Sequence, residues 1–130
     1  MSADTYILVV DDEPNIRQLI ALVLAREGYR VETAASGHEC LERVHRQSPA
    51  LILLDLQMPG LTGVEVIERL RAEATTREIP IVLISGSTYL TGFSRVDNVE
   101  GFIEKPFDLD DLLTTVGRFC PAIARSSVSS

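Results

Sequence analysis

The sequence predicts an α/β fold, a doubly wound parallel sheet of five strands with helices on both faces. Five short apolar runs rich in branched residues recur along the 130-residue chain, and helical patterns fill most of the intervals between them. Three of the runs are apolar without alternation, which is typical of strands covered on both faces. Strands that alternate with helices are joined by right-handed crossovers, which place the strands parallel in one sheet.

The predicted strands are the apolar runs themselves: YILVV (6–10), RVETA (30–34), ALILL (50–54), IPIVLIS (79–85) and GFIE (101–104). Ligands of open parallel sheets bind beyond the carboxyl ends of the strands, where the order of the strands changes direction. The residues at the ends of these runs are therefore the candidate functional residues.

The first and last predicted helices have clear ends. Pro14 suits a first helical turn and Gly28 suits a stop, so they bound the first helix. Its apolar residues follow one helical face: Ile16, Leu19, Ile20, Val23 and Leu24. Asp108 can cap the last helix, which ends before Pro121. The apolar stripe of that helix consists of Leu109, Leu112, Leu113, Val116 and Phe119.

Two middle helices begin with capping-box patterns. Ser36 with Glu39 opens one helix, and Thr62 with Glu65 opens the other. In such a box the N-cap hydroxyl and the later glutamate each accept a hydrogen bond from the other's backbone amide. The inward residues are Leu41 and Val44 in the first helix, and Val66, Ile67 and Leu70 in the second.

Composition restricts the classes of function. The 19 acidic residues outnumber the 12 basic ones, and aromatic residues are few, which argues against direct nucleic-acid binding. Cys40 and Cys120 match no metal-ligand spacing and are interpreted as packed apolar residues in a reducing compartment. The N-terminus resembles neither a signal peptide nor a membrane span, so we expect a cytoplasmic protein without membrane contacts. Residues 1–120 are predicted to form one domain, and residues 121–130 a polar, disordered tail.

Polar residues stand at the ends of four of the predicted strands: Asp11, Asp12 and Glu13, then Asp55, then Ser85, then Lys105. If the first and third strands are neighbours, Asp11, Asp12 and Asp55 share one cleft. Two carboxylates about 5 Å apart repel by roughly 3 kcal/mol at an effective dielectric constant near 20. A hard divalent cation removes this repulsion, and Mg²⁺ suits a site of a few carboxylates, one carbonyl and several waters. The strand ends therefore predict a magnesium site.

Lys105 is the only lysine of the chain, and it stands between Glu104 and Pro106. Its ammonium is a compact charge that suits a phosphoryl oxygen, and a cis bond to Pro106 is a candidate way of directing it to the cleft. Each of these residues has an ordinary explanation, since acids before a helix usually cap it and a lone lysine is usually solvated. Their convergence on one end of the sheet favours a site. His38 and His45 lie on a helix away from it and are interpreted as surface residues.

Four motifs occur in order along the chain: LVVDDEP, LILLDLQMPGLTG, LISGS and GFIEKPF. Together they make the chain resemble the receiver domains of bacterial two-component response regulators, from Tyr6 to about Cys120. The resemblance implies the flavodoxin-like strand order 2-1-3-4-5. It also implies a phosphoacceptor regulatory domain rather than an enzyme, one that assists its own phosphorylation and its slow dephosphorylation.

The resemblance assigns a role to each site residue. Asp55 would accept a phosphoryl group from the phosphohistidine of a sensor kinase or a phosphotransfer protein. Asp12 would bind Mg²⁺ or Mn²⁺ directly and Asp11 largely through water, with the backbone carbonyl of Gln57 as a further ligand. Lys105 would pair with the acceptor carboxylate and then with the phosphoryl group.

The resemblance also implies a switch. Ser85, where many relatives have threonine, would hydrogen-bond a phosphoryl oxygen, and Phe102 would turn in to fill the space behind it. The face of the fourth helix, fifth strand and fifth helix would then regulate a downstream partner or effector domain, and it is a candidate homodimer interface. Residues 86–101, where the fourth helix belongs, contain three glycines, so we expect that helix to be short, mobile or remodelled.

Three alternatives compete with this interpretation. A metal-dependent phosphohydrolase with an aspartyl-phosphate would resemble D-x-D after the strand, whereas Asp55 is followed by Leu56 and Gln57. A flavin-binding module would need a hydroxyl- and glycine-rich loop after the first strand, where this chain has DDEP. A receiver-like scaffold that is never phosphorylated is disfavoured because all the site carboxylates and the lysine are present.

Overall fold

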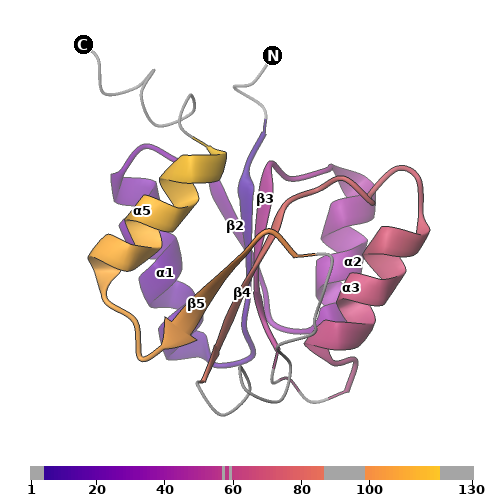
Figure 1. Cartoon of the computed structure of the whole chain (residues 1–130), viewed down its shortest axis with the longest axis horizontal. Coiled ribbons are helices and arrows are strands. Elements are labelled where there is room, and N and C mark those ends of the chain that lie inside the picture. Colours follow the sequence, from indigo (N-terminus) through magenta and orange to yellow (C-terminus); the bar gives the residue numbers. More distant parts are fainter. Residues whose placement is uncertain (1–4, 57, 59, 87–98, 121–130) are drawn as a thin grey trace.

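The computed structural model describes residues 5–56, 58, 60–86 and 99–120 of the chain. Five parallel strands form one sheet in the order β2-β1-β3-β4-β5, as expected (Figure 1). The strands are β1 (Ile7–Val10), β2 (Val31–Ala34), β3 (Leu51–Asp55), β4 (Ile81–Gly86) and β5 (Gly101–Lys105). Most begin one or two residues later than the apolar runs. Asp55 and Lys105 are the last residues of their strands, and Ser85 lies inside β4 instead of following it.

Four helices cover the sheet: α1 (Pro14–Arg26), α2 (Gly37–Arg46), α3 (Gly63–Ala72) and α5 (Leu109–Phe119). Helices α1 and α5 lie on one face and α2 and α3 on the other (Figure 1). None of the helices in the described ranges is long and apolar enough to cross a membrane. The predicted fourth helix falls largely on residues 87–98, and the predicted tail on residues 121–130, both outside the described residues. The domain boundary at residue 120 stays a prediction.

Of the two predicted capping boxes, one forms both of its hydrogen bonds and the other forms only one. At α3, the Thr62 hydroxyl accepts from the Glu65 amide and the Glu65 carboxylate accepts from the Thr62 amide, which confirms the box. The bond from the Thr62 amide, followed by a second bond from the Thr62 hydroxyl to the same carboxylate oxygen, lowers the pKa of Glu65. At α2, Ser36 caps the Glu39 amide, but the Glu39 carboxylate accepts from Ala35 instead of Ser36. The second box is therefore only half formed.

The core consists of two apolar layers, one on each face of the sheet. Along β3, Ile52 and Leu54 belong to the layer under α2 and α3, while Leu51 and Leu53 belong to the layer under α1 and α5. All five residues of this central strand are buried, as the unalternating run predicts. Fully burying such a side chain contributes about 1.5–3 kcal/mol, so β3 is held firmly in place.

Two residues that were expected to face the core do not. Leu19 of α1 is 42% exposed and Leu109 of α5 is 41% exposed. Both line a groove beside Pro106. Helical periodicity identifies the apolar side of a helix, but it does not show which residues of that side the rest of the fold covers.

Candidate functional site

The pairing of the strands brings three carboxylates together. Val10 of β1 is opposite Leu54 of β3, so the next residues, Asp11 and Asp55, follow at the same level. Oxygens of Asp11, Asp12 and Asp55 lie within 4.8 Å of one another. Asp11 and Asp55 are 2% and 4% exposed, whereas Asp12 faces solvent. The carboxylate cluster predicted from the strand ends is thus present.

Lys105 reaches this cluster from two strands away. Its Nζ lies 3.3 Å from an oxygen of Asp11 and 3.7 Å from an oxygen of Asp55. The peptide bond between Lys105 and Pro106 is cis. At a separation of no more than 4.8 Å, the ionised carboxylates of Asp11 and Asp55 would repel by roughly 3 kcal/mol or more at an effective dielectric constant near 20. The ammonium of Lys105 offsets part of that repulsion, but one cation does not neutralise three anions.

Ser85 adds a buried hydroxyl from the strand between β3 and β5. The residue is fully buried, and its Oγ has no hydrogen-bond partner among the residues that the structure describes. An unsatisfied buried hydroxyl costs about 1–3 kcal/mol and calls for an explanation. A ligand that brings an acceptor oxygen beyond the strand ends would satisfy it.

Every polar atom of Asp11, in the backbone and in the side chain, takes part in a hydrogen bond. Its amide donates to Ala34 O at 3.2 Å, its Oδ1 accepts from Glu13 N at 2.9 Å, and its Oδ2 accepts from Lys105. Its backbone carbonyl accepts from Arg17 Nη1 at 2.8 Å. Glu13 is the N-cap of α1 but makes no side-chain cap bond, so helix capping alone does not explain the acidic run. Sequence reasoning missed Arg17; its only signal was a basic residue one turn after the acidic loop.

The start of α3 packs against the backbone of the cluster. A Cβ added to Gly63 would lie 2.8 Å from the carbonyl oxygen of Asp55 and 2.8 Å from the Cα of Leu56. Only glycine permits this approach, which places the α3 N-terminus next to Asp55. Gln57, the predicted carbonyl ligand, lies outside the described residues.

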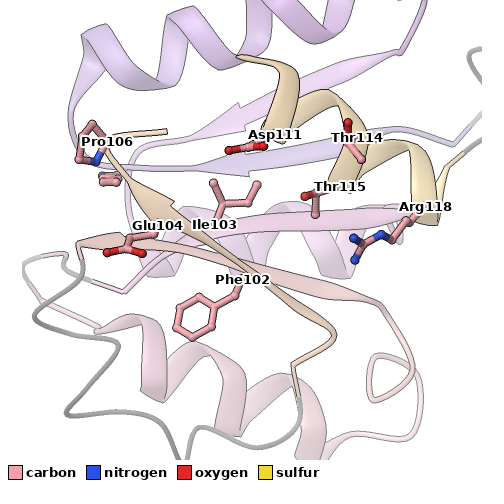
Figure 2. Close-up of a pocket in the computed structure, with 9 residues that line it drawn as sticks. Phe102, Ile103, Glu104, Pro106, Asp111, Thr114, Thr115 and Arg118 are labelled. Carbon is pink, nitrogen blue, oxygen red and sulfur yellow. The ribbon is translucent and has the colours of Figure 1, made fainter. Parts of the chain in front are cut away.

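The predicted switch residue Phe102 lies on the exposed side of β5. Its side chain is 41% exposed and projects from β5 on the side away from Asp111 and Thr115 of α5 (Figure 2). It lines the rim of a cavity of about 360 Å³ together with residues of α5 such as Arg118. The side chain is thus partly solvated in this structure, and its inward motion stays a prediction.

A groove borders the site on its other side. It has a volume of about 610 Å³ and is mainly apolar, and it runs between α1 and the segment that joins β5 to α5. The residues that line it are Ile16, Leu19, Lys105, Pro106, Phe107, Asp108 and Leu109. Lys105 both lines this groove and contacts the carboxylate cluster, so the groove lies beside the site.

The remaining titratable candidates take no part in the site. His38 and His45 are exposed on α2, as expected, and His45 pairs with Glu73 at 3.0 Å. Burial raises the pKa of Cys40 to about 12 and the pKa of Cys120 to about 11. Both thiols are therefore protonated at neutral pH, which makes them poor nucleophiles and agrees with a packing role.

The chemistry of the cluster fits a hard cation. Carboxylate oxygens are the ligands that Mg²⁺ prefers, and it usually takes only one or two from the protein while keeping several waters. Asp12, at the exposed side of the cluster, leaves room for such waters. The buried hydroxyl of Ser85 and the ammonium of Lys105 suit the oxygens of a phosphoryl group. The site can therefore hold a divalent cation beside a phosphoryl group.

Comparisons with known proteins agree with this chemistry. Residues 7–117 match the family model of the response regulator receiver domain. Sporulation initiation phosphotransferase F of Bacillus subtilis (strain 168) is 32% identical over 115 residues, which cover 88% of this chain and 93% of that protein. Response regulator ArlR of Staphylococcus aureus (strain Mu50 / ATCC 700699) is 32% identical over 86% of this chain but only 51% of its own length. The chain thus spans about half of the ArlR protein.

Solved structures give the same result. Chemotaxis response regulator CheY4 of Vibrio cholerae has a TM-score of 0.80 and 32% identity, covering 88% of this chain and 98% of that one. Response regulator TrrA of Thermotoga maritima, solved in complex with Mg(2+)-BeF, has a TM-score of 0.80 and 33% identity over the same shares.

Proposed function

Since the chain belongs to the family of response regulator receiver domains, we propose that Asp55 accepts a phosphoryl group from a phosphohistidine of a partner protein. A receiver domain is a phosphorylation-dependent signalling domain of two-component systems and not a classical enzyme. The observation that carries the proposal is the position of the buried Asp55 carboxylate, beside the ammonium of Lys105 and the unsatisfied hydroxyl of Ser85.

The transfer follows from the groups at the site. A carboxylate oxygen of Asp55 attacks the phosphorus, and the phosphorus–nitrogen bond of the phosphohistidine breaks. The electron pair of that bond returns to the imidazole, which takes a proton from water. Asp55 needs no separate base because it is already an anion. Lys105 moves its interaction from the Asp55 carboxylate to the phosphoryl oxygens, and the Ser85 hydroxyl donates to one of them.

A bound Mg²⁺ would supply charge neutralisation, which dominates phosphoryl transfer because that reaction needs positioning more than covalent chemistry. Asp11, Asp12 and Asp55 would hold it, and the carbonyl of Gln57 remains the predicted fourth protein ligand. Mn²⁺ prefers similar oxygen ligands and is expected to substitute.

Phosphorylation would act on the surface through the added charge. A phosphoryl group brings roughly −1.5 to −2 charges, which attract Lys105 and Ser85. We propose that the movement of Ser85 is followed by inward rotation of Phe102. The face that includes β5 and α5 then changes shape, to regulate a downstream protein or effector domain or to form a homodimer. Slow hydrolysis at Asp55 resets the domain.

The apolar groove beside Lys105 is the proposed docking site for the partner that carries the phosphohistidine. Leu19 and Leu109 on its walls are each about two-fifths exposed, which is typical of an interaction surface. A helical segment seated there would place a histidine next to Asp55, because Lys105 borders both. The cytoplasmic location expected from the sequence stays a prediction.

The proposal is tested by incubating the protein with acetyl phosphate and Mg²⁺ and measuring its intact mass. We expect the wild type to gain the mass of one phosphoryl group and Asp55→Asn to gain nothing. Asp111→Asn, an equal change on the outer surface of α5, serves as the control and is expected to behave like the wild type. Phosphorylation of the Asp55→Asn protein would contradict the assignment.

The comparisons give no support to the phosphohydrolase, flavin or scaffold alternatives. The same assay separates the first of them, because a phosphohydrolase would turn over a phosphate ester such as p-nitrophenyl phosphate rapidly instead of retaining one phosphoryl group.

A further inference from the structure

We propose that Arg17 is a positioning residue of the cation site. Its guanidinium holds the backbone carbonyl of Asp11 and thereby places the carboxylate of Asp12 at the cluster. This inference rests on the proposed function, because it takes the three carboxylates to be the ligands of a divalent cation.

The first step is the geometry of one peptide group. Arg17 Nη1 donates to the carbonyl oxygen of Asp11 at 2.8 Å. That carbonyl and the amide of Asp12 form one rigid plane, so a bond that holds the oxygen also holds the orientation of the Asp12 backbone. Arg17 itself belongs to the first turns of α1, where its amide donates to Glu13 O at 3.0 Å. The anchor is therefore part of a regular helix.

The second step is that Asp12 depends on this backbone more than its neighbours do. Asp11 is buried and held at both carboxylate oxygens, by Glu13 N and Lys105 Nζ. Asp12 is exposed, and within the described part of the chain no hydrogen bond or ion pair involves its carboxylate. The backbone of Asp12 is therefore the part of this residue that the protein holds in place, and Arg17 fixes the peptide group that precedes it.

The third step separates this role from simple electrostatics. A guanidinium next to a cation site repels the cation, so removing its charge alone would strengthen Mg²⁺ binding. Removing a group that orients a ligand weakens binding, typically by 10- to 100-fold for outer-shell partners of metal sites. The two explanations predict opposite signs for the same substitution.

The test is calorimetric titration of the whole chain with MgCl₂. We expect Arg17→Met, which keeps the apolar stem, to weaken Mg²⁺ binding about 10-fold or more. Arg17→Lys keeps a donor and the charge, and is expected to restore much of the affinity. The matched control is Arg26→Met in the last turn of the same helix, which is expected to bind like the wild type. Binding by Arg17→Met that equals or exceeds that of the wild type would overturn the inference.

A kinetic measurement excludes a general defect of folding. In Arg17→Met, the Mg²⁺ concentration for half-maximal phosphorylation by acetyl phosphate should rise about 10-fold or more, while the rate at saturating Mg²⁺ recovers. A misfolded variant would lose the saturated rate as well, and that outcome would count against positioning. Failure of the wild type to take up Mg²⁺ would overturn both proposals, whereas an effect-free Arg17→Met overturns only this one.

Discussion

At the amino ends of the strands, two buried hydroxyls donate short hydrogen bonds, whereas at the carboxyl ends buried polar groups gather around the candidate site. The Tyr6 hydroxyl, just before β1, donates to Gln47 O at 2.6 Å. The Thr76 hydroxyl, in the loop that leads to β4, donates to Leu70 O at 2.6 Å. Both residues are buried, and both bonds cap the end of a helix.

Arg71, near the end of α3, makes further hydrogen bonds at the amino ends of the strands. The Arg71 guanidinium donates to the carbonyls of Arg77 and Ile79 at 2.8 Å each, and to the Glu100 carboxylate at 3.0 Å. The same Glu100 oxygen accepts from the Ile81 amide at 2.7 Å, while the Glu100 amide donates to Ile81 O at 2.8 Å. This network joins the end of α3 to the starts of β4 and β5.

The carboxyl end shows the opposite arrangement. Two buried carboxylates lie within 4.8 Å of each other, and the buried hydroxyl of Ser85 has no partner in the described ranges. Such an arrangement lowers stability in the absence of a ligand and favours binding of one, which is a common exchange at functional sites. Bonds that stabilise the fold therefore lie at the amino ends of the strands and groups that bind a ligand at the carboxyl ends, and variants at the two ends should separate the two properties.

The largest expected effect is on ligand-dependent stability at the carboxyl end. In the wild type, Mg²⁺ at a hundred times its dissociation constant should raise the free energy of unfolding by about 2.7 kcal/mol. Asp12→Asn should lose most of this gain while its unfolding in EDTA stays within about 0.5 kcal/mol of the wild type. Urea denaturation with and without Mg²⁺ measures both, and an unchanged Mg²⁺ effect in the variant would break the comparison.

The next effect belongs to the amino end. Arg71→Met should lower the free energy of unfolding by about 2 kcal/mol, because the largely buried guanidinium is lost together with its bonds to the partly buried Ile79 carbonyl and to Glu100. Its Mg²⁺ affinity should equal that of the wild type. Arg69→Met, on the same helix but exposed, should cost less than about 0.5 kcal/mol. A loss of Mg²⁺ binding in Arg71→Met would show that the two ends are coupled.

Ser85→Ala should raise the stability of the protein, in contrast to Arg71→Met. Removal of the unsatisfied hydroxyl is expected to raise the free energy of unfolding by about 1 kcal/mol. The same change should slow phosphorylation by acetyl phosphate, because a donor to the phosphoryl group is lost. Lower stability of this variant would mean that the hydroxyl has a partner in the folded protein.

The last expected effect is a pH dependence at the amino end, which appears only at high pH. Burial, with a smaller contribution from Glu32, raises the pKa of Tyr6 to about 12 from 10.0. The stabilising contribution of this raised pKa is complete below pH 10 and is lost as the pH rises toward 12. Stability should therefore fall less steeply over this range in Tyr6→Phe than in the wild type, as measured by thermal unfolding at several pH values. Parallel curves for the two proteins would contradict the assignment.

Much of the fold was predictable because its signals are local. The cap of α3 at Thr62, the cap of α5 at Asp108 and the start of α1 at Pro14 each depend on a few consecutive residues, and all three are confirmed. The predicted capping box at Ser36 was wrong in one partner, since the Glu39 carboxylate accepts a hydrogen bond from the amide one residue before Ser36. Exposure of Leu19 was also missed, because periodicity does not show which residues of an apolar stripe the neighbouring elements cover.

The order of the elements, the buried strands and the kinds of residue at their ends can be predicted from the amino-acid sequence, because propensity, capping and burial patterns act over short distances along the chain. The contact of Lys105 with Asp11, 94 residues away, at 3.3 Å, and the bond from Arg17 to the Asp11 carbonyl are visible only in the folded structure. Those contacts depend on the register of the strands and on the packing of α1, to which every part of the core contributes. A short sequence pattern gives no distance between residues that are far apart along the chain. The charged groups of the site therefore come close together only in the assembled sheet.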